Sequence, residues 1–163
     1  LCPPISMSAS QTALDAPEMS LYRITILEIL KVKYRWLARN ARRENRSMMV
    51  PLNDLQRVQR FYEWDQTVVC PRFGYDSVEA YYDAVSVGPK LKDLKVPSLL
   101  IFGREDPIVP FDAVESFLGA APRDCTVRVV SPGGHLGFPR RTDLGFGGRL
   151  GVHNQVSQWI QNL

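Results

Sequence analysis

Two side chains suited to acid–base chemistry follow two short apolar stretches in the second half of the sequence. Asp106 lies in residues 103–110, directly after the apolar stretch 96–102, and His135 lies in residues 131–138, after the β-branched stretch 125–130. A carboxylate that hydrogen-bonds one imidazole nitrogen fixes the tautomer, so the other nitrogen can take a proton from a nucleophile. Asp106 and His135 are therefore the candidate acid and base.

The elements around these residues are predicted to bring them together. The pattern indicates a strand over 96–102, a helix over 111–118, a strand over 125–130 and a helix over 152–160. Two strands joined by a helix pair in parallel with a right-handed crossover. Their carboxyl ends then share one edge of the sheet, ~4.8 Å apart, where open α/β sheets bind ligands. We expect the carboxylate and the imidazole to touch there.

The first half of the chain is predicted to be helical. Residues 1–19 are rich in Pro, Ser and Ala and indicate an irregular lead-in. Helical spacing predicts a helix from Ser20 onwards, a second over 53–64 that ends before Cys70–Pro71, and a short third over 77–82. The expected organisation is α/β, with a helical segment over residues 20–89 and a β-α-β-α segment over residues 90–163.

Composition removes several classes of protein. The 163 residues are 45% hydrophobic and 23% charged with a net charge of +3, which excludes disordered and fibrous chains. No apolar stretch reaches the ~20 residues of a membrane span. Cys2, Cys70 and Cys125 lie far apart, which favours free thiols in a reduced intracellular compartment. The cysteines and the two histidines have no zinc-ligand spacing, so neither a metal nor a cofactor is expected.

Each candidate residue also has a structural interpretation. An aspartate after a strand often forms a turn or caps a helix, and a histidine after two glycines is often an ordinary loop residue. The order of Asp106 and His135 across one β-α-β unit is what favours chemistry over these alternatives.

The motifs around the pair resemble a known family. The segments VPSLLIFGREDPIVP (96–110) and VVSPGGHLGF (129–138) are similar to the last two core strands of the α/β-hydrolase superfamily, in particular its YheT-like, embryogenesis-associated branch. The resemblance implies that Asp106 is the acid, that His135 is the general base, and that Glu105 is a neighbour of the acid. It also implies that residues 20–89 form the helical cap and residues 90–163 the C-terminal part of the hydrolase core.

A nucleophile is missing from the printed sequence. Such enzymes carry a serine in a G-x-S-x-G elbow, and this motif does not occur in the chain. We expect residue 1 to lie just downstream of that elbow, so that the chain pairs with the N-terminal half of the fold. The resemblance implies a serine-type esterase for lipid or medium-chain acyl esters, with acyl transfer to alcohols as a variant. The alternative is a non-catalytic pseudoenzyme or an interaction module.

Residues 31–46, from Lys31 to Arg46, form a strongly basic segment. They hold seven basic residues and one acid, so the segment carries +6 while the whole chain carries +3. Three interpretations are open: a solvated helix face, an anionic membrane surface and, least favoured, nucleic acid. A glycine-rich stretch over residues 140–150 is predicted to be a flexible loop.

Overall fold

The computed structural model describes residues 2–48 and 50–163. They form two compact units, one made of Leu1–Ser10 with Ser86–Leu163 and the other of Gln11–Val85. The chain passes from one unit to the other between residues 10 and 11 and again between residues 85 and 86, whereas the boundary was expected between residues 89 and 90.

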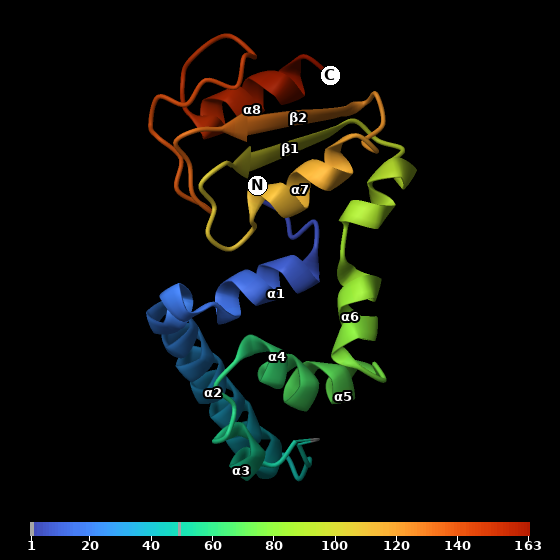
Figure 1. Ribbon diagram of the computed structural model, residues 1–163. Helices are drawn as coiled ribbons and strands as arrows, with labels where there is room; N and C mark the ends of the chain where they lie inside the picture. Colours follow the sequence, from blue (N-terminus) through green and yellow to red (C-terminus); the bar gives the residue numbers. More distant parts are fainter. Residues whose placement is uncertain (1, 49) are drawn as a thin grey trace. The chain divides into compact units, whose positions relative to one another are not determined.

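A two-stranded parallel sheet is the centre of the first unit (Figure 1). Strand β1 (Ser98–Gly103) pairs with β2 (Cys125–Val130), and the register runs from Ser98 opposite Cys125 to Gly103 opposite Val130. Helix α7 (Phe111–Leu118) connects the strands, and α8 (Val152–Gln161) follows β2. The predicted strand–helix–strand–helix order and the parallel pairing are confirmed, with β1 beginning two residues later than expected.

Both faces of the sheet are covered by helices. Phe102 of β1 is buried in one cluster with Val114 of α7, whereas its neighbour Ile101 is buried in another cluster with Val152 of α8. Successive side chains of a strand point to opposite faces, so this division places α7 and α8 on opposite sides of the sheet, as Figure 1 shows. An apolar run with no alternation, such as residues 99–102, is the pattern that burial on both faces requires.

The expectation of an irregular lead-in is wrong for most of residues 1–19. Helix α1 spans Met7–Asp15, and a single 3-10 turn spans Pro17–Met19. Ser6 caps the beginning of α1, because its Oγ accepts a hydrogen bond from the Ala9 N–H at 3.3 Å. Ile5 is fully buried in the cluster under α7, so the residues before α1 belong to the core of the first unit.

The glycine-rich stretch 140–150 has no helix or strand, but it is anchored to α8. The fully buried side chain of Gln155 accepts hydrogen bonds from the N–H groups of Leu144 and Phe146, and it donates to the carbonyls of Gly147 and Arg149. One side chain therefore satisfies four backbone groups of the stretch, and the expectation of a flexible loop needs correction.

The second unit is helical, as predicted, but its helices are divided differently. Helix α2 (Ser20–Arg43) begins at the predicted serine. The helix expected over 53–64 is split into two short helices, and helical structure continues through Cys70, where a break was expected. The segments are α3 (Leu52–Leu55), α4 (Phe61–Trp64), the π-helical η2 (Asp65–Val69), α5 (Cys70–Phe73) and α6 (Val78–Val85).

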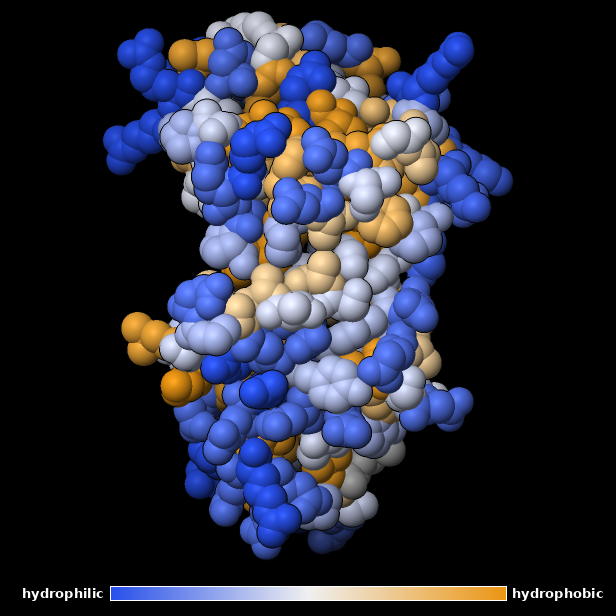
Figure 2. All heavy atoms as spheres, viewed as in Figure 1, coloured by the Kyte–Doolittle hydropathy of each residue, from blue (hydrophilic) through white to orange (hydrophobic). Residues whose placement is uncertain are grey.

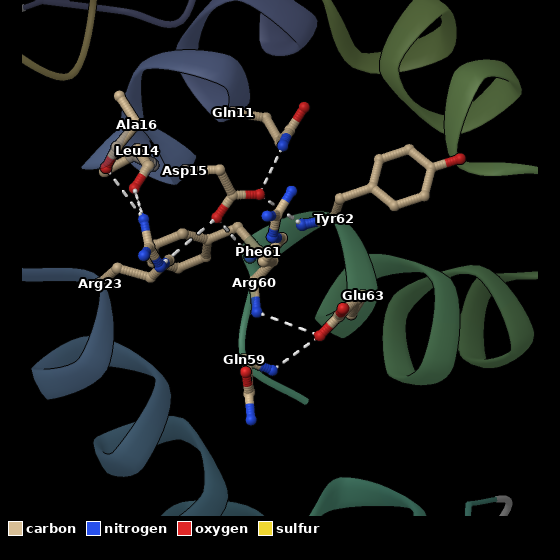
Figure 3. Close-up of polar contacts among 10 residues, drawn as sticks. All are labelled: Gln11, Leu14, Asp15, Ala16, Arg23, Gln59, Arg60, Phe61, Tyr62 and Glu63. Atoms are coloured by element: carbon tan, nitrogen blue, oxygen red, sulfur yellow. Dashed lines mark hydrogen bonds and ion pairs between the residues drawn. The ribbon is translucent and has the colours of Figure 1, made fainter. Parts of the chain in front are cut away.

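A long-range cap explains where α4 begins. The Asp15 carboxylate accepts hydrogen bonds from the N–H groups of Phe61 (2.9 Å) and Tyr62 (3.3 Å), the first two residues of α4 (Figure 3). Gln11 also donates to Asp15, and Arg23 of α2 approaches it at 4.0 Å. Asp15 lies 46 residues before Phe61 in the sequence, so local spacing could not reveal this contact. The same helix start also has a local cap, because the Glu63 carboxylate accepts hydrogen bonds from two N–H groups just before α4.

Pro71 does not interrupt the helical segment. It follows directly on η2, a π-helical turn in which the regular α-helical hydrogen bonding is already interrupted. The segment ends at Gly74, whose φ of 74° is the left-handed conformation typical of a helix end.

Candidate active site

Asp106 lies in the turn that follows β1, and its side chain is 1% exposed. Its Oδ1 accepts hydrogen bonds from the N–H groups of Ile108 at 2.8 Å and Val109 at 3.0 Å. These two contacts orient the carboxylate and leave Oδ2 directed at a second partner. The turn-forming interpretation of Asp106 is therefore correct for one oxygen, and the other oxygen is available for the site.

His135 is that second partner. Its Nδ1 lies 3.0 Å from Oδ2 of Asp106, and the imidazole is 33% exposed. The expected contact across the β-α-β unit is thus present in the structure. With the carboxylate ionised, Nδ1 carries the hydrogen and donates it to Asp106, which leaves the lone pair of Nε2 as a proton acceptor.

Glu105 joins the two loops that carry the pair. Its carboxylate accepts hydrogen bonds from the Ser131 hydroxyl and, at 2.9 Å, from the Gly133 N–H group. The hydrogen bond from Ser131 is the main cause that lowers the pKa of Glu105, and that from Gly133 adds to it. The sequence showed Glu105 only as a neighbour of Asp106, whereas in the structure it holds the histidine loop against the aspartate loop.

Gly103, the last residue of β1, allows these loops to approach each other. A Cβ at this position would lie 2.3 Å from the Gly133 carbonyl oxygen and 2.9 Å from that of Gly134. Real Cβ atoms do not tolerate such contacts with backbone, so only glycine fits. Gly103 therefore has a role in positioning His135.

Cys2 is a third side chain at this site that sequence analysis did not place there. Sγ of Cys2, a carboxylate oxygen of Asp106 and a ring nitrogen of His135 all lie within 4.8 Å of one another. The pKa of Cys2 is raised to about 11, mainly by burial and in smaller part by the Asp106 carboxylate. Thiolate, imidazole and carboxylate are ligands that zinc accepts, but at neutral pH Cys2 is a protonated thiol beside an acid–imidazole pair.

No hydroxyl group of the described residues hydrogen-bonds the imidazole. Ser6 Oγ lies 3.1 Å from Ser8 Oγ near the start of α1, and Ser131 Oγ is used by Glu105. Within residues 2–48 and 50–163 the Asp106–His135 pair thus has no adjoining hydroxyl nucleophile.

A parallel β-α-β unit with a buried carboxylate hydrogen-bonded to an imidazole at its carboxyl edge is compatible with an α/β protein. The curated proteins to which the chain is similar are esterases and lipases of the α/β-hydrolase superfamily, which confirms the resemblance seen in the motifs.

Three relatives illustrate the range of the similarity. The chain is 24% identical over 159 residues to "Putative esterase YheT" of Escherichia coli, a match that covers 98% of this chain and 43% of that protein. It is 28% identical over 98 residues to the phospholipase ABHD3 of Homo sapiens, covering 58% of this chain and 24% of the relative. It is 33% identical over 76 residues to the medium-chain fatty acid ethyl ester synthase/esterase 2 of Saccharomyces cerevisiae, a match that covers 47% of this chain and 17% of that protein.

The chain thus spans less than half of the length of each of these relatives. No protein-family model matches the chain, and no solved structure is significantly similar to it.

Proposed function

We propose that this chain forms the C-terminal part of an α/β-hydrolase fold and supplies the acid and the base of a serine-type carboxylic ester hydrolase. The observation that carries the proposal is the 3.0 Å contact between Nδ1 of His135 and Oδ2 of the buried Asp106. Its support from outside the chain is the similarity to esterases, lipases and a phospholipase.

The mechanism follows from the orientation of the imidazole. Nε2 of His135 takes the proton of a hydroxyl nucleophile as that oxygen attacks the ester carbonyl carbon, and it later returns a proton to the departing alkoxide. Asp106 keeps Nδ1 protonated and balances the positive charge that forms on the ring. Because the carboxylate is held by the N–H groups of residues 108 and 109, it is oriented before the substrate arrives.

The nucleophile in this proposal is a serine outside the printed sequence, which contains no G-x-S-x-G elbow. The N-terminal half of the fold would provide this serine and the missing strands. Cys2 does not replace it, because its thiol is buried and its pKa is raised away from neutral pH.

The substrate class is an ester with an apolar acyl chain. Leu136 follows the base directly and is 72% exposed, so it offers an apolar contact beside His135. Relatives named as a monoacylglycerol lipase and as a fatty acid ethyl ester synthase/esterase favour lipid or medium-chain acyl esters, with an alcohol as an alternative acceptor to water.

The test is the replacement of His135 by alanine in the natural protein. We expect ester turnover (kcat/KM) to fall by about 10³-fold or more, because no other group takes the proton of the nucleophile. His153→Ala is the matched control, since His153 is exposed on α8 and makes no contact with Asp106. Full activity in His135→Ala contradicts the proposal, and so does an active-site serine probe that fails to label the wild-type protein.

A further inference from the structure

Helix α2 presents an exposed apolar stripe on the side opposite to its packed face. The exposed fractions are 78% for Leu21, 46% for Ile29, 57% for Val32 and 60% for Trp36. The offsets of 8, 11 and 15 residues from Leu21 to Ile29, Val32 and Trp36 place these side chains on one side of the helix.

The opposite side of α2 is the one that the second unit buries. Leu27, Tyr34, Ala38 and Ala41 are buried, and Leu27 and Tyr34 belong to the core of this unit. A helix on the surface of a globular unit normally has charged and polar residues on its outer side. The stripe on α2 therefore has no partner within the described part of its own unit.

Positive charge surrounds and follows the stripe. Lys33 and Arg35 lie on either side of Val32 and Trp36, and Arg39 and Arg43 continue the line of the stripe towards the end of α2. In Figure 2, orange side chains protrude beside the beginning of α2, and blue side chains cover its later part.

These charges are not neutralised within the unit. Lys31 is buried and pairs with Glu28 at 2.9 Å, and Arg46 pairs with Glu44. By contrast, Lys33, Arg39 and Arg43 form no ion pair with a carboxylate of the described residues. The basic segment of residues 31–46 thus divides into paired side chains and free cations along one exposed face.

We propose that this face of α2 docks on an anionic phospholipid surface, with the helix axis in the plane of the interface. Leu21, Ile29 and Val32 enter the boundary between headgroups and acyl chains, and Trp36 occupies the headgroup level. Lys33, Arg35, Arg39 and Arg43 contact the lipid phosphates.

Charge complementarity distinguishes this partner from two others. A second copy of the chain would bring like charges together at the flanks of the stripe, which opposes association. Nucleic acid would satisfy the cations but would leave the aliphatic side chains in water, because bases stack on aromatic rings rather than on aliphatic groups. The inference does not depend on ester hydrolysis, since Asp106 and His135 lie in the other unit.

The experiment measures flotation of the natural protein with two kinds of vesicle. One kind is pure phosphatidylcholine, and the other contains about one-third phosphatidylserine. We expect binding to the anionic vesicles that weakens as salt is raised, with a blue shift of tryptophan emission that Trp36→Phe abolishes. Equal binding to both vesicles, or binding to neither, overturns the proposal.

Paired variants separate the apolar and the charged contributions. Ile29→Ser/Val32→Ser and Lys33→Glu/Arg39→Glu should each weaken binding to anionic vesicles by at least about tenfold. Ile160→Ser and Lys92→Glu/Arg123→Glu are the matched controls, because they change exposed residues of the other unit and should bind as the wild type does.

Two further results would contradict the proposal. If Ile29→Ser/Val32→Ser lowers the unfolding temperature, the stripe is already packed against part of the protein. If the same variant converts a dimer into a monomer without changing lipid binding, the face is an interface between copies of the chain.

Discussion

The candidate acid Asp106 owes its orientation to three contacts made by one carboxylate. Oδ1 is held by two backbone N–H groups of its own turn, and Oδ2 meets the imidazole of His135. The local contacts could be anticipated from the Asp-Pro turn sequence, and the contact with His135 from the order of the elements. Catalysis by this pair stays a prediction.

Asp106→Asn should reduce turnover by about 10⁴-fold while the fold is kept. The amide preserves the size of the side chain and the local turn, but it does not stabilise the imidazolium and it favours the wrong tautomer. Turnover is to be measured as kcat/KM for an ester substrate. Asp112→Asn, at an exposed position of α7, is the control. Unchanged turnover in Asp106→Asn would remove Asp106 from the acid role.

Asp65 and Tyr82 form a second buried polar pair, in the helical unit. The Tyr82 hydroxyl donates to Asp65 Oδ2 at 2.7 Å. Burial is the main cause that raises the pKa of Asp65 to about 6, and the charge of Asp15 raises it too, whereas the Tyr82 hydrogen bond opposes the shift. The folded state therefore holds the proton more tightly than the unfolded state does. Between about pH 4 and 6 this residue makes stability fall as pH rises.

Asp65→Asn should raise the free energy of unfolding at pH 7 by on the order of 1–2 kcal/mol, because the buried charge is removed and the acceptor for Tyr82 is kept. The variant should also lose the fall in stability between about pH 4 and 6. Urea unfolding at several pH values measures both effects. Asp83→Asn, exposed on α6, should change neither quantity. A variant that is less stable than the wild type at pH 7 would show that the carboxylate is needed in its ionised form.

At the scale of elements, patterns of apolar residues predicted the strands well. The predicted bounds of β2 and α7 agree with the structure because each is a short segment between turn-forming residues, Asp124 and Ser131 for β2 and Pro110 and Gly119 for α7. The helix over 53–64 failed for a different reason. Residues 56–60 are not helical, and a new helix begins at Phe61, where the remote Asp15 caps the first N–H groups of α4.

The close approach of β1 to the histidine loop leads to a prediction about Gly103. Gly103→Ala places a methyl group 2.3 Å from the Gly133 carbonyl oxygen, so the loops must separate. We expect the free energy of unfolding to fall by about 2 kcal/mol. Turnover should fall by more than this loss of stability explains, since His135 moves away from Asp106. Denaturant unfolding and esterase assays measure the two effects.

Gly119→Ala is the control for Gly103→Ala. Gly119 follows α7 with a φ of −64°, and a Cβ there meets nothing within 4 Å. This variant should change stability by less than about 0.5 kcal/mol. If both glycine variants behave alike, the approach of the two loops is not what positions the histidine.

At the scale of the whole molecule, the described residues contain a sheet of two strands only. Isolated sheets of this size are marginal in water, and parallel strands need both faces covered. Here α7 and α8 cover the faces, and the outer edge of β1 receives only the Cys2 N–H group, which donates to the Ile101 carbonyl at 2.7 Å.

The chain expressed by itself should therefore aggregate, or it should unfold in a broad thermal transition with a low midpoint temperature. Co-expression with the proposed N-terminal half, which would extend the sheet beyond β1, should give a soluble complex with a sharper transition. Size-exclusion chromatography and scanning calorimetry make the comparison. A monomer with a sharp thermal transition for the chain alone would contradict this expectation.

No helix of the described residues is both long enough and apolar enough to cross a membrane. Helix α2 has the length, but its charges exclude a span, and its exposed apolar stripe has the character of an interfacial helix instead. Net charge alone is compatible with all three interpretations of residues 31–46, and the vesicle experiment tests the membrane interpretation.

The sequence by itself determined the elements whose signals are local. These are the strands, α7, α8, the start of α2 and the order in which Asp106 and His135 follow parallel strands. The tertiary structure decided what depends on contacts between remote residues. These features are the hydrogen bonds by which Glu105 joins the two loops, the buried thiol of Cys2, the cap from Asp15 and the exposed face of α2. The physical reason is that periodicity reports one segment's preference for a buried side, whereas a hydrogen bond or a burial partner belongs to two segments that meet only in the folded chain.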